Sequence, residues 1–216
     1  MQAPPIVKIC GLSTAPTLDA ALAAGADMVG FVFFGPSPRN VTPALASQLA
    51  RRVNGRAKKV ALTVDADDAT LDAILAALEP DILQLHGRET PARTAEIRAR
   101  ASLPIMKALG VSTADDLAAV AVYEPIADWL LFDAKPPKEA TRPGGNAFSF
   151  DWAILDAFRT RKPWLLSGGL DPANVAEALA RTGAPGVDVS SGVESAPGVK
   201  DEAKIRAFVA AARGLS

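Results

Sequence analysis

Eight short apolar runs recur along the chain, each followed by turn residues and then by a segment rich in alanine. The runs lie at residues 6–9, 28–32, 59–64, 82–85, 104–108, 129–132, 164–166 and 186–189. They show no sustained alternation of polar and apolar positions, which is typical of strands buried on both faces of a parallel sheet. The pattern therefore predicts eight parallel strands.

The segments between these runs carry apolar residues at helical spacing. They lie at residues 18–24, 43–51, 70–78, 91–100, 114–120 and 172–181, and a last one lies at 201–213. Three of them begin with a capping residue and a proline, at Thr42-Pro43, Thr90-Pro91 and Asp171-Pro172. Proline is favoured at the first position of a helix, so these pairs predict helix starts.

Eight strand and helix units within roughly 200 to 250 residues are typical of a (β/α)8 barrel. The alternative is an open, doubly wound α/β sheet, which usually has five or six strands and a glycine fingerprint after the first strand. Here the first run is followed by the residues GLS at 11–13, and no G-x-G-x-x-G stretch occurs. We therefore predict an α/β fold, a single (β/α)8 TIM barrel domain spanning residues 1–216.

Composition limits the classes of partner. The 23 lysines and arginines nearly balance the 24 acidic residues, so no overall charge attracts nucleic acid or an acidic membrane. No apolar stretch approaches the roughly 20 residues of a spanning helix. One cysteine excludes an internal disulfide, and the first residues lack the features of a signal peptide. We expect a cytoplasmic protein, a monomer or homodimer, that binds a small molecule and neither nucleic acid nor membrane.

Two of the expected loops are long, at residues 34–42 after the second strand and 134–149 after the sixth. Both follow the carboxyl ends of strands, where barrels place their active sites. Their proline and glycine content predicts defined loops, and we expect the second to be able to act as a mobile lid.

Polar residues stand where the apolar runs end, and in a closed barrel these ends converge on one mouth. They are Cys10, Arg39, Asp65, Gln84, His86, Lys107, Asp133, Ser167, Gly168, Gly169, Asp188, Ser190, Ser191 and Gly192. Any one of them, taken singly, is equally well explained as a helix cap or a turn residue. Taken together they favour a site.

Two glycine-containing loops follow the last two strands, SGGL at 167–170 and SSGV at 190–193. Barrels commonly bind phosphate at this place, because glycines let backbone N–H groups approach the anion and a short helix directs its positive end at it. The two loops together predict a phosphorylated ligand. Its phosphate would be held by Gly168, Gly169, Ser190, Ser191 and Gly192.

Cys10 and Asp133 end the first and sixth strands, three steps apart around a ring of eight, and would face each other across the mouth. A thiol and a carboxyl on opposite sides of a substrate suit a general base and a general acid. Cys10 is otherwise a small buried apolar residue, and Asp133 a cap or turn residue. Asp65, at the end of the third strand, is the rival carboxylate.

A thiol with a pKa of about 8.5 is a poor base at neutral pH unless a cation stabilises the thiolate. Lys8 lies two residues before Cys10 on the same strand face, about 6.6 Å along the strand. One hypothesis is that Lys8 helps to activate Cys10. The alternative is that its ammonium group pairs with a carboxylate of the barrel.

His86 is the only histidine, and no cysteine or carboxylate stands near it at the spacing of metal ligands. We predict no metal site and no cofactor, and interpret His86 as a substrate contact or a hydrogen-bonded turn residue. Arg39 has the planar group that clamps a carboxylate with two hydrogen bonds, although a loop arginine is as often solvated.

Motifs in order along nearly the whole chain resemble the phosphoribosylanthranilate isomerase family of tryptophan biosynthesis. They read VKICG at 7–11, AGAD at 24–27, GFVF at 30–33, SPR at 37–39, QLHG at 84–87, LFD at 131–133, FDW at 150–152, LSGGL at 166–170 and GVDVSSGVE at 186–194. Two departures stand out. The family usually has Gly-Gly-Thr-Gly before FDW where this chain reads GGNAFS at 144–149, and often a phenylalanine where LTV stands at 62–64.

The resemblance implies an isomerase that carries out a metal-free Amadori rearrangement of N-(5-phosphoribosyl)anthranilate to 1-(2-carboxyphenylamino)-1-deoxyribulose 5-phosphate. By family analogy, Asp133 protonates the ribose ring oxygen and Cys10 removes the proton from the 2′ carbon of the resulting Schiff base. Arg39 would hold the anthranilate carboxylate and the glycine loops the phosphate. We expect the remaining substrate contacts from Gln84, His86 and Asp188.

Two other functions remain open from the residues. One is another phosphosugar barrel such as an indole-glycerol-phosphate synthase, for which a lysine acid and a glutamate are expected. This chain offers Lys107 but has Cys10 at the end of the first strand, which disfavours that reading. The other is a non-catalytic phosphosugar-binding barrel, which would keep the glycine loops and need neither Cys10 nor Asp133.

Overall fold

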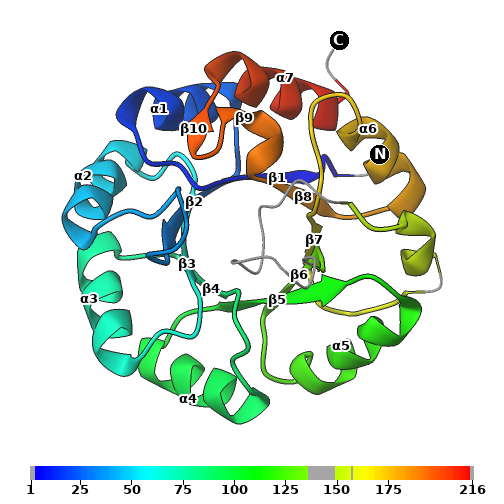
Figure 1. Cartoon of the computed structure of the whole chain (residues 1–216), viewed down its shortest axis with the longest axis horizontal. Coiled ribbons are helices and arrows are strands. Elements are labelled where there is room, and N and C mark those ends of the chain that lie inside the picture. The colour runs from blue at the N-terminus through cyan, green and yellow to red at the C-terminus, as the bar shows by residue number, and fades with distance from the viewer. Residues whose placement is uncertain (1–2, 136–148, 157, 215–216) are drawn as a thin grey trace.

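The structure is a computed structural model that describes residues 3–135, 149–156 and 158–214. Eight strands in this part of the chain close into a parallel barrel, in chain order around the ring. Viewed along the barrel axis, the strands form an inner ring and the helices an outer one (Figure 1). The predicted (β/α)8 TIM barrel is confirmed, and the open sheet is excluded.

Each strand of the barrel coincides with one predicted apolar run. The strands are β1 Ile6–Cys10, β2 Met28–Phe33, β3 Lys58–Thr63, β4 Ile82–Leu85, β5 Ile105–Val111, β6 Trp129–Ala134, β7 Trp164–Leu166 and β8 Gly186–Val189. Only β5 and β6 run clearly past their predicted ends, because they pair with each other as far as Val111 and Ala134. The barrel closes where Lys8 on β1 lies beside Asp188 on β8.

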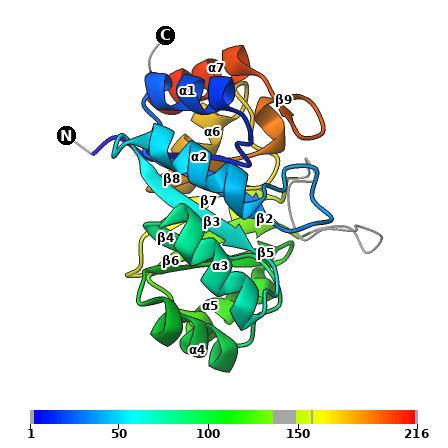
Figure 2. The same cartoon turned by 90° about the vertical axis from the view of Figure 1, so that its left-hand side faces the viewer.

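The outer ring consists of helices that follow the strands. They are α1 Ala15–Ala24, α2 Pro43–Val53, α3 Asp68–Leu78, α4 Pro91–Ala101, α5 Ala118–Tyr123, α6 Val175–Thr182 and α7 Glu202–Ala212, with 3-10 turns η1 Ala114–Leu117, η2 Trp152–Leu155 and η3 Ser191–Val193. Two short strands, β9 Glu194–Ala196 and β10 Val199–Lys200, form a hairpin after β8. This hairpin and the loop after β2 lie at the same end of the barrel (Figure 2).

The helix starts follow from local capping in two of the three predicted cases. The hydroxyls of Thr42 and Thr90 accept hydrogen bonds from backbone N–H groups three residues later, as expected of N-caps. The third prediction is wrong, because α6 begins at Val175 and not at Pro172. The carboxylate of Asp171 instead closes a turn that precedes the helix, accepting from the N–H groups of Ala173 and Asn174.

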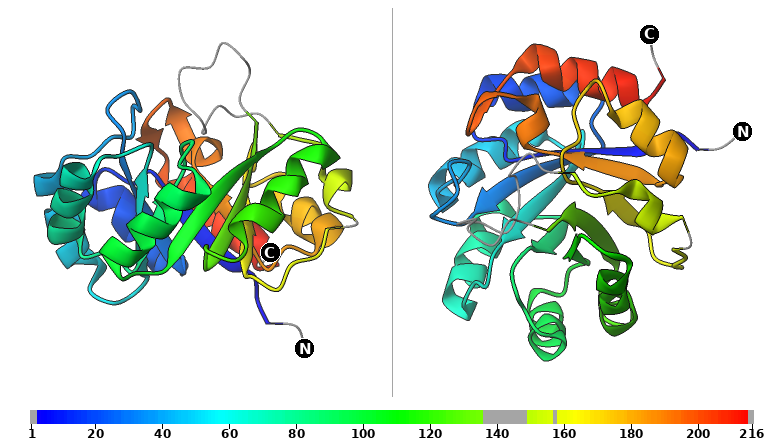
Figure 3. Two further views of the ribbon diagram at one scale, coloured as in Figure 1. Left: turned by 90° about the horizontal axis from the view of Figure 1, so that it is seen from below. Right: turned by 45° about the vertical axis from the view of Figure 1, so that its right-hand side comes forward.

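Apolar side chains fill both sides of the barrel wall. Residues such as Val7 and Ile9 face outward and pack against the helices. The lumen at the amino ends of the strands is filled by a separate cluster of Met28, Val60, Ile82, Met106, Ala108, Leu131 and Leu165. The side view in Figure 3 shows how the strands run from this end toward the end that carries the hairpin. The floor of the barrel is therefore closed, and chemistry is restricted to the opposite end.

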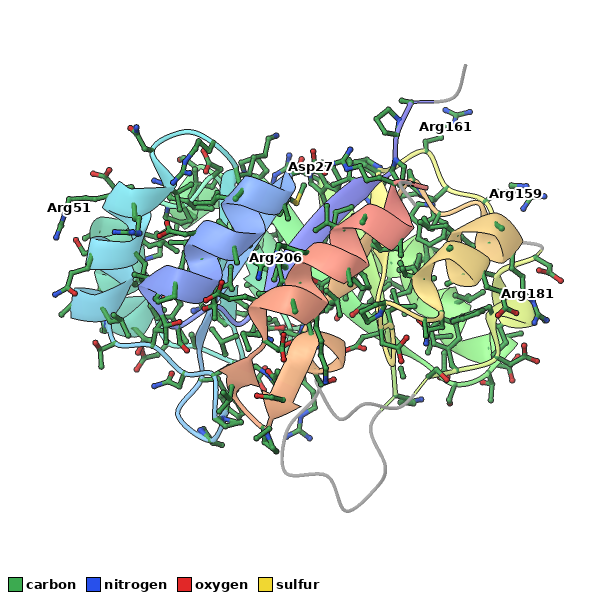
Figure 4. The ribbon with its side chains drawn as sticks, turned by 90° about the horizontal axis from the view of Figure 1, so that it is seen from above. Asp27, Arg51, Arg159, Arg161, Arg181 and Arg206 are labelled. Carbon is green, nitrogen blue, oxygen red and sulfur yellow. The ribbon has the colours of Figure 1, made fainter. Side chains whose placement is uncertain are left out.

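Charged side chains lie mainly on the outside of the ring. Figure 4 shows Arg51 on α2 and Arg181 on α6 pointing away from the barrel at its two edges. None of the described helices has the length and apolar character needed to cross a membrane. The predicted lid after β6 lies, for residues 136–148, outside the described part of the chain, and so do the departures from the family pattern at 144–148.

Candidate active site

The carboxyl end of the barrel holds polar side chains that are almost completely buried. Lys8 is 0% exposed, Gln84 0%, Asp188 5% and Asp133 6%. Charged groups are seldom buried to this degree unless they are paired, because removing them from water is costly. The partners of these groups therefore indicate what the site is built to do.

Lys8 and Asp188 form an ion pair inside the lumen. The Nζ atom of Lys8 lies 2.7 Å from Oδ1 of Asp188, and Oδ2 of Asp188 accepts a hydrogen bond of 3.3 Å from the hydroxyl of Ser167. Burial opposes the charged form of Lys8, but attraction to Asp188 and Cys10 outweighs it, so the pKa of Lys8 is raised. The predicted alternative, a barrel carboxylate as the partner of Lys8, is thus confirmed.

Cys10 ends β1 on the same strand face as Lys8. Its side chain is 3% exposed and packs against Val32 and Leu62. Burial raises the pKa of the Cys10 thiol, while the ammonium group of Lys8 acts in the opposite direction. Burial is therefore the largest influence against the thiolate, and Lys8 is the largest influence that favours it.

Asp133 on β6, His86 directly after β4 and Gln84 on β4 form a chain of hydrogen bonds. Oδ2 of Asp133 lies 3.2 Å from Nε2 of His86, and the amide nitrogen of Gln84 lies 2.9 Å from Nδ1 of the same ring. Since the amide donates to Nδ1, a neutral ring carries its proton on Nε2 and donates it to Asp133. The other oxygen of Asp133 accepts from the N–H of Ala134 at 2.9 Å. His86 thus contacts the proposed acid directly.

The two glycine loops lie against each other beside Asp133. Gly168 and Gly169 have φ of +88° and +65°, conformations that favour glycine. A Cβ atom on Gly168 would lie 2.5 Å from the nitrogen of Ala134 and 3.1 Å from Oδ1 of Asp133. A Cβ atom on Gly192 would collide with the carbonyl oxygen of Leu170. The structure therefore brings both predicted phosphate loops together, and Ser191 and Gly192 form the η3 turn.

Arg39 makes a two-pronged ion pair that the sequence did not indicate. Its Nε and Nη2 atoms lie 2.6 and 2.8 Å from the two carboxylate oxygens of Glu194. Lys200 binds the same carboxylate at 2.8 Å and donates to the carbonyl and hydroxyl oxygens of Ser190 at 2.8 and 3.1 Å. Burial opposes ionisation of Glu194, yet Arg39 and Lys200 outweigh it and lower its pKa. Glu194 stands in one of the family motifs, but its spacing carried no sign of this role.

Lys107 and Asp65 do not join the lumen, contrary to the prediction that all these strand ends meet at one mouth. Met106 and Ala108 point into the lumen, so Lys107 between them points outward. Its Nζ atom lies 2.9 Å from the carboxylate of Glu89. Asp65 accepts a hydrogen bond of 2.7 Å from the N–H of Arg88 in the next loop. The geometry therefore favours Asp133 over Asp65 as the acid.

The described residues contain no group of three or more His, Cys, Asp or Glu side chains positioned to hold a metal ion. A thiol, a carboxyl and two glycine-containing loops instead surround one lumen. Residues 7–211 match the model of the N-(5′-phosphoribosyl)anthranilate (PRA) isomerase family. The chain belongs to this family. It is accordingly an isomerase, and the relatives support PRA isomerase activity in tryptophan biosynthesis.

Sequence and structure comparisons agree on the PRA isomerase family. N-(5′-phosphoribosyl)anthranilate isomerase of Rhodopseudomonas palustris strain BisA53 is 62% identical over 207 residues, which cover 96% of this chain and 95% of the relative. The crystal structure of TrpF from Jonesia denitrificans is 38% identical, with a TM-score of 0.81 and 98% of each chain covered.

A PRA isomerase crystallised with reduced 1-(o-carboxyphenylamino)-1-deoxyribulose 5-phosphate is also similar to this chain. It is 31% identical, with a TM-score of 0.83, and the likeness covers 98% of this chain and 100% of the other. The resemblance to the family found in the motifs is thereby confirmed over almost the entire chain.

Proposed function

We propose that this chain isomerises N-(5′-phosphoribosyl)anthranilate to 1-(2-carboxyphenylamino)-1-deoxyribulose 5-phosphate, with Asp133 as general acid and Cys10 as general base. The observation that carries the assignment is the placement of the two side chains. Cys10 ends β1 and Asp133 is the last residue but one of β6, three strands apart in a ring of eight, on strand faces that share one lumen. A substrate between them meets a proton donor on one side and a proton acceptor on the other.

The first step opens the furanose ring. Asp133 gives its proton to the ring oxygen, the bond between that oxygen and C1′ breaks, and the nitrogen lone pair forms the iminium. The carboxylate that remains accepts hydrogen bonds from the Ala134 N–H and from Nε2 of His86. These donors stabilise the product of the proton transfer and so lower its barrier.

The second step moves the C2′ proton. The Cys10 thiolate takes this proton, and the electron pair of the C–H bond flows toward the iminium to give an enolamine. The enolamine becomes the ketone when the Asp133 carboxylate takes the O2′ proton and the Cys10 thiol gives its proton to C1′, so that both residues return to their starting states. Because burial raises the pKa of Cys10, the positive charge of Lys8 is needed to stabilise the thiolate form.

Binding groups surround these two residues. We assign the phosphate to Gly168, Gly169, Ser190, Ser191 and Gly192, which belong to the two adjoining loops after β7 and β8. We place the anthranilate carboxylate beside Arg39, whose guanidinium plane is oriented by Glu194. Gln84, His86 and Asp188 face the same lumen and are assigned to the ribose part of the substrate.

An assay with freshly made phosphoribosylanthranilate tests the function through the loss of anthranilate-type fluorescence. The wild type is expected to remove the signal faster than the uncatalysed reaction, and the lack of any such excess would refute the activity. The substitutions Cys10→Ser and Asp133→Asn should each lower kcat by about two orders of magnitude or more. Circular dichroism checks that both variants fold, and wild-type turnover in either one would overturn its assigned role.

A further inference from the structure

Lys107 and Glu89 form a buried ion pair that the proposed mechanism does not use. Lys107 lies on β5 and Glu89 in the loop between β4 and α4, and they are 2% and 4% exposed. Their charged atoms are 2.9 Å apart. A buried ion pair is a weak source of stability, since two well-packed apolar residues often serve as well or better. Its role is therefore to be sought in what the two charged groups hold.

The pair holds the backbone on both sides of His86. The Nζ atom of Lys107 donates to the carbonyl oxygens of Leu85 and Gly87, at 3.3 and 2.8 Å. The carboxylate of Glu89 accepts the N–H of Gly87 with both oxygens, at 3.2 and 3.0 Å. The two peptide groups that flank the Cα atom of His86 are thus each bound to a charged group, which makes the stronger kind of hydrogen bond.

Neighbouring elements anchor the pair itself. Glu89 also accepts the N–H of Asp65, which follows β3, at 3.0 Å. The hydroxyl of Tyr123 on α5 donates to the carbonyl oxygen of Glu89 at 2.8 Å, and its ring lies below the ammonium group of Lys107. The clamp on His86 is therefore fixed to both the preceding and the following units of the barrel.

The side chain of His86 reaches in the opposite direction, into the lumen. Its Nε2 atom lies 3.2 Å from Asp133, a distance at the long end of the hydrogen-bond range, so a small shift of the backbone would break the contact. Gln84 on β4, two residues before His86, sets which ring nitrogen carries the proton, but it does not hold the backbone of His86.

We propose that Lys107 and Glu89 are positioning residues that hold His86 so that its Nε2–H points at Asp133. This inference rests on the proposed function, in which Asp133 is the acid. Neither residue touches the substrate, because both lie outside the lumen. They act on the reaction only through the backbone of the histidine.

The single histidine of the chain gives a direct test. In untagged protein labelled with ¹⁵N in the imidazole ring, every ring signal belongs to His86. The wild type is expected to show one tautomer, protonated on Nε2. In Lys107→Met the ring signals should shift toward a mixture of tautomers and broaden, because the carbonyl groups of Leu85 and Gly87 lose their charged donor. The N–H of His86, which donates to the carbonyl oxygen of Thr63 at 2.9 Å, holds only one side of the residue. Unchanged ring signals in this variant would overturn the proposal.

Kinetics separate positioning from binding. Lys107→Met is expected to lower kcat about ten- to a hundredfold, the effect of a displacement near 1 Å, with little change in KM. A rise in KM with unchanged kcat would contradict the proposal. Arg98→Met is the matched control. It breaks an ion pair between the last turn of α4 and Asp128, the residue before β6, and does not contact His86 or its neighbours. It should leave both kcat and the ring signals as in the wild type.

A double variant guards against simple misfolding. Lys107→Met leaves Glu89 buried without its partner, whereas Lys107→Met with Glu89→Gln leaves no unpaired charge and should fold more stably than the single variant. We expect its ring signals and kcat to stay impaired. Recovery of both to wild-type values would mean that the pair is merely structural. Absence of turnover in the wild type would contradict the proposed function alone, because the ring signals are read without substrate.

Discussion

Lys8 and Asp188 join the first strand of the barrel to the last, with 2.7 Å between Nζ and Oδ1. They are partners in the register that closes the ring. The ammonium group also lies close enough to Cys10 to favour its thiolate against the effect of burial. The same lysine therefore helps to close the barrel and to stabilise the thiolate of the proposed base.

Removing this ammonium group should leave a smaller fraction of Cys10 as the thiolate. In Lys8→Met the pKa of the thiol is expected to rise further, because burial remains and the attraction of Lys8 is lost. Ultraviolet absorbance of the thiolate measures this without ambiguity, since Cys10 is the only cysteine, and Cys10→Ser supplies the blank. An unchanged thiol pKa would disprove the role of Lys8.

The same substitution should destabilise the barrel by about 3–5 kcal/mol, because Asp188 is left buried without its partner. The pKa of Lys8 is raised in the folded state, so the ion pair contributes fully below the pKa of an unfolded lysine, about 10.4. Its contribution falls as the pH rises through the higher folded value. Urea unfolding of the wild type and of Lys8→Met should show a difference in the free energy of unfolding that is constant around neutral pH. This difference should become smaller only in strong alkali.

Gly30 leaves the space that the thiol occupies. It is the register partner of Cys10, and a Cβ atom on it would lie 2.9 Å from Sγ. We expect Gly30→Ala to displace the thiol, lower kcat more than tenfold and cost about 1–3 kcal/mol of stability through overpacking. Gly35→Ala is the control, since nothing lies within 4 Å of its added carbon. Equal activity in the two variants would show that the position of Sγ is not critical.

Gly168 combines a left-handed backbone with close contact to the proposed acid. Gly25 has nearly the same φ, +86° against +88°, but open space around its added carbon. Gly25→Ala should cost about 1–2 kcal/mol from backbone strain alone and keep full activity. Gly168→Ala should lose more stability and most of its kcat, because the new carbon meets Ala134 and Asp133. Thermal unfolding and the isomerase assay compare Gly25→Ala with Gly168→Ala. Equal losses of stability and of kcat in the two variants would contradict this explanation.

Glu194 holds two cations together at the mouth. Glu194→Gln keeps its shape but removes the negative charge that Arg39 and Lys200 share, so we expect a KM at least tenfold higher with a smaller change in kcat. The exposed Glu202→Gln, which loses only a surface pair with Arg206, is the control. A normal KM in Glu194→Gln would remove Arg39 from the proposed carboxylate site.

The stability effect of the same variant has a defined pH range. The pKa of Glu194 is lowered in the folded state, so its charge stabilises the fold above the unfolded value of about 4.3. That contribution disappears as the pH falls through the lower folded value. The difference in the free energy of unfolding between the wild type and Glu194→Gln should therefore be present at neutral pH and disappear in acid.

Most of the fold was predictable because strands buried on both faces leave continuous apolar runs. Even the three residues of β7, Trp164–Leu166, stand out in this way. The start of α6 was not predictable from its Asp-Pro pair. The side-chain amide of Asn174 donates to the carbonyl oxygen of Gly169, which draws the preceding residues into a turn against the loop that follows β7. Such a contact leaves no trace in local spacing.

The candidate site was predictable as a set of strand ends but not as a set of contacts. Gly168 with Gly192, and Asp133 with His86, were placed at the same mouth from their positions alone. Lys107 was also predicted at the mouth, but its side chain lies on the outer face of the barrel wall. A strand that is apolar on both faces does not alternate, so nothing in its residues tells which face points into the lumen.

The order of strands and helices, the polar residues at the strand ends and the family all follow from the sequence alone. The pairing of the charged groups follows only from the tertiary structure. Lys8 meets Asp188 across 180 positions of the chain, and Arg39 meets Glu194 across 155. Closing the ring brings such residues together and removes them from water. A charged side chain buried in this way is stable only when it is paired with a group of opposite charge. Local pattern specifies the elements, whereas the closed barrel specifies which charged groups pair inside it.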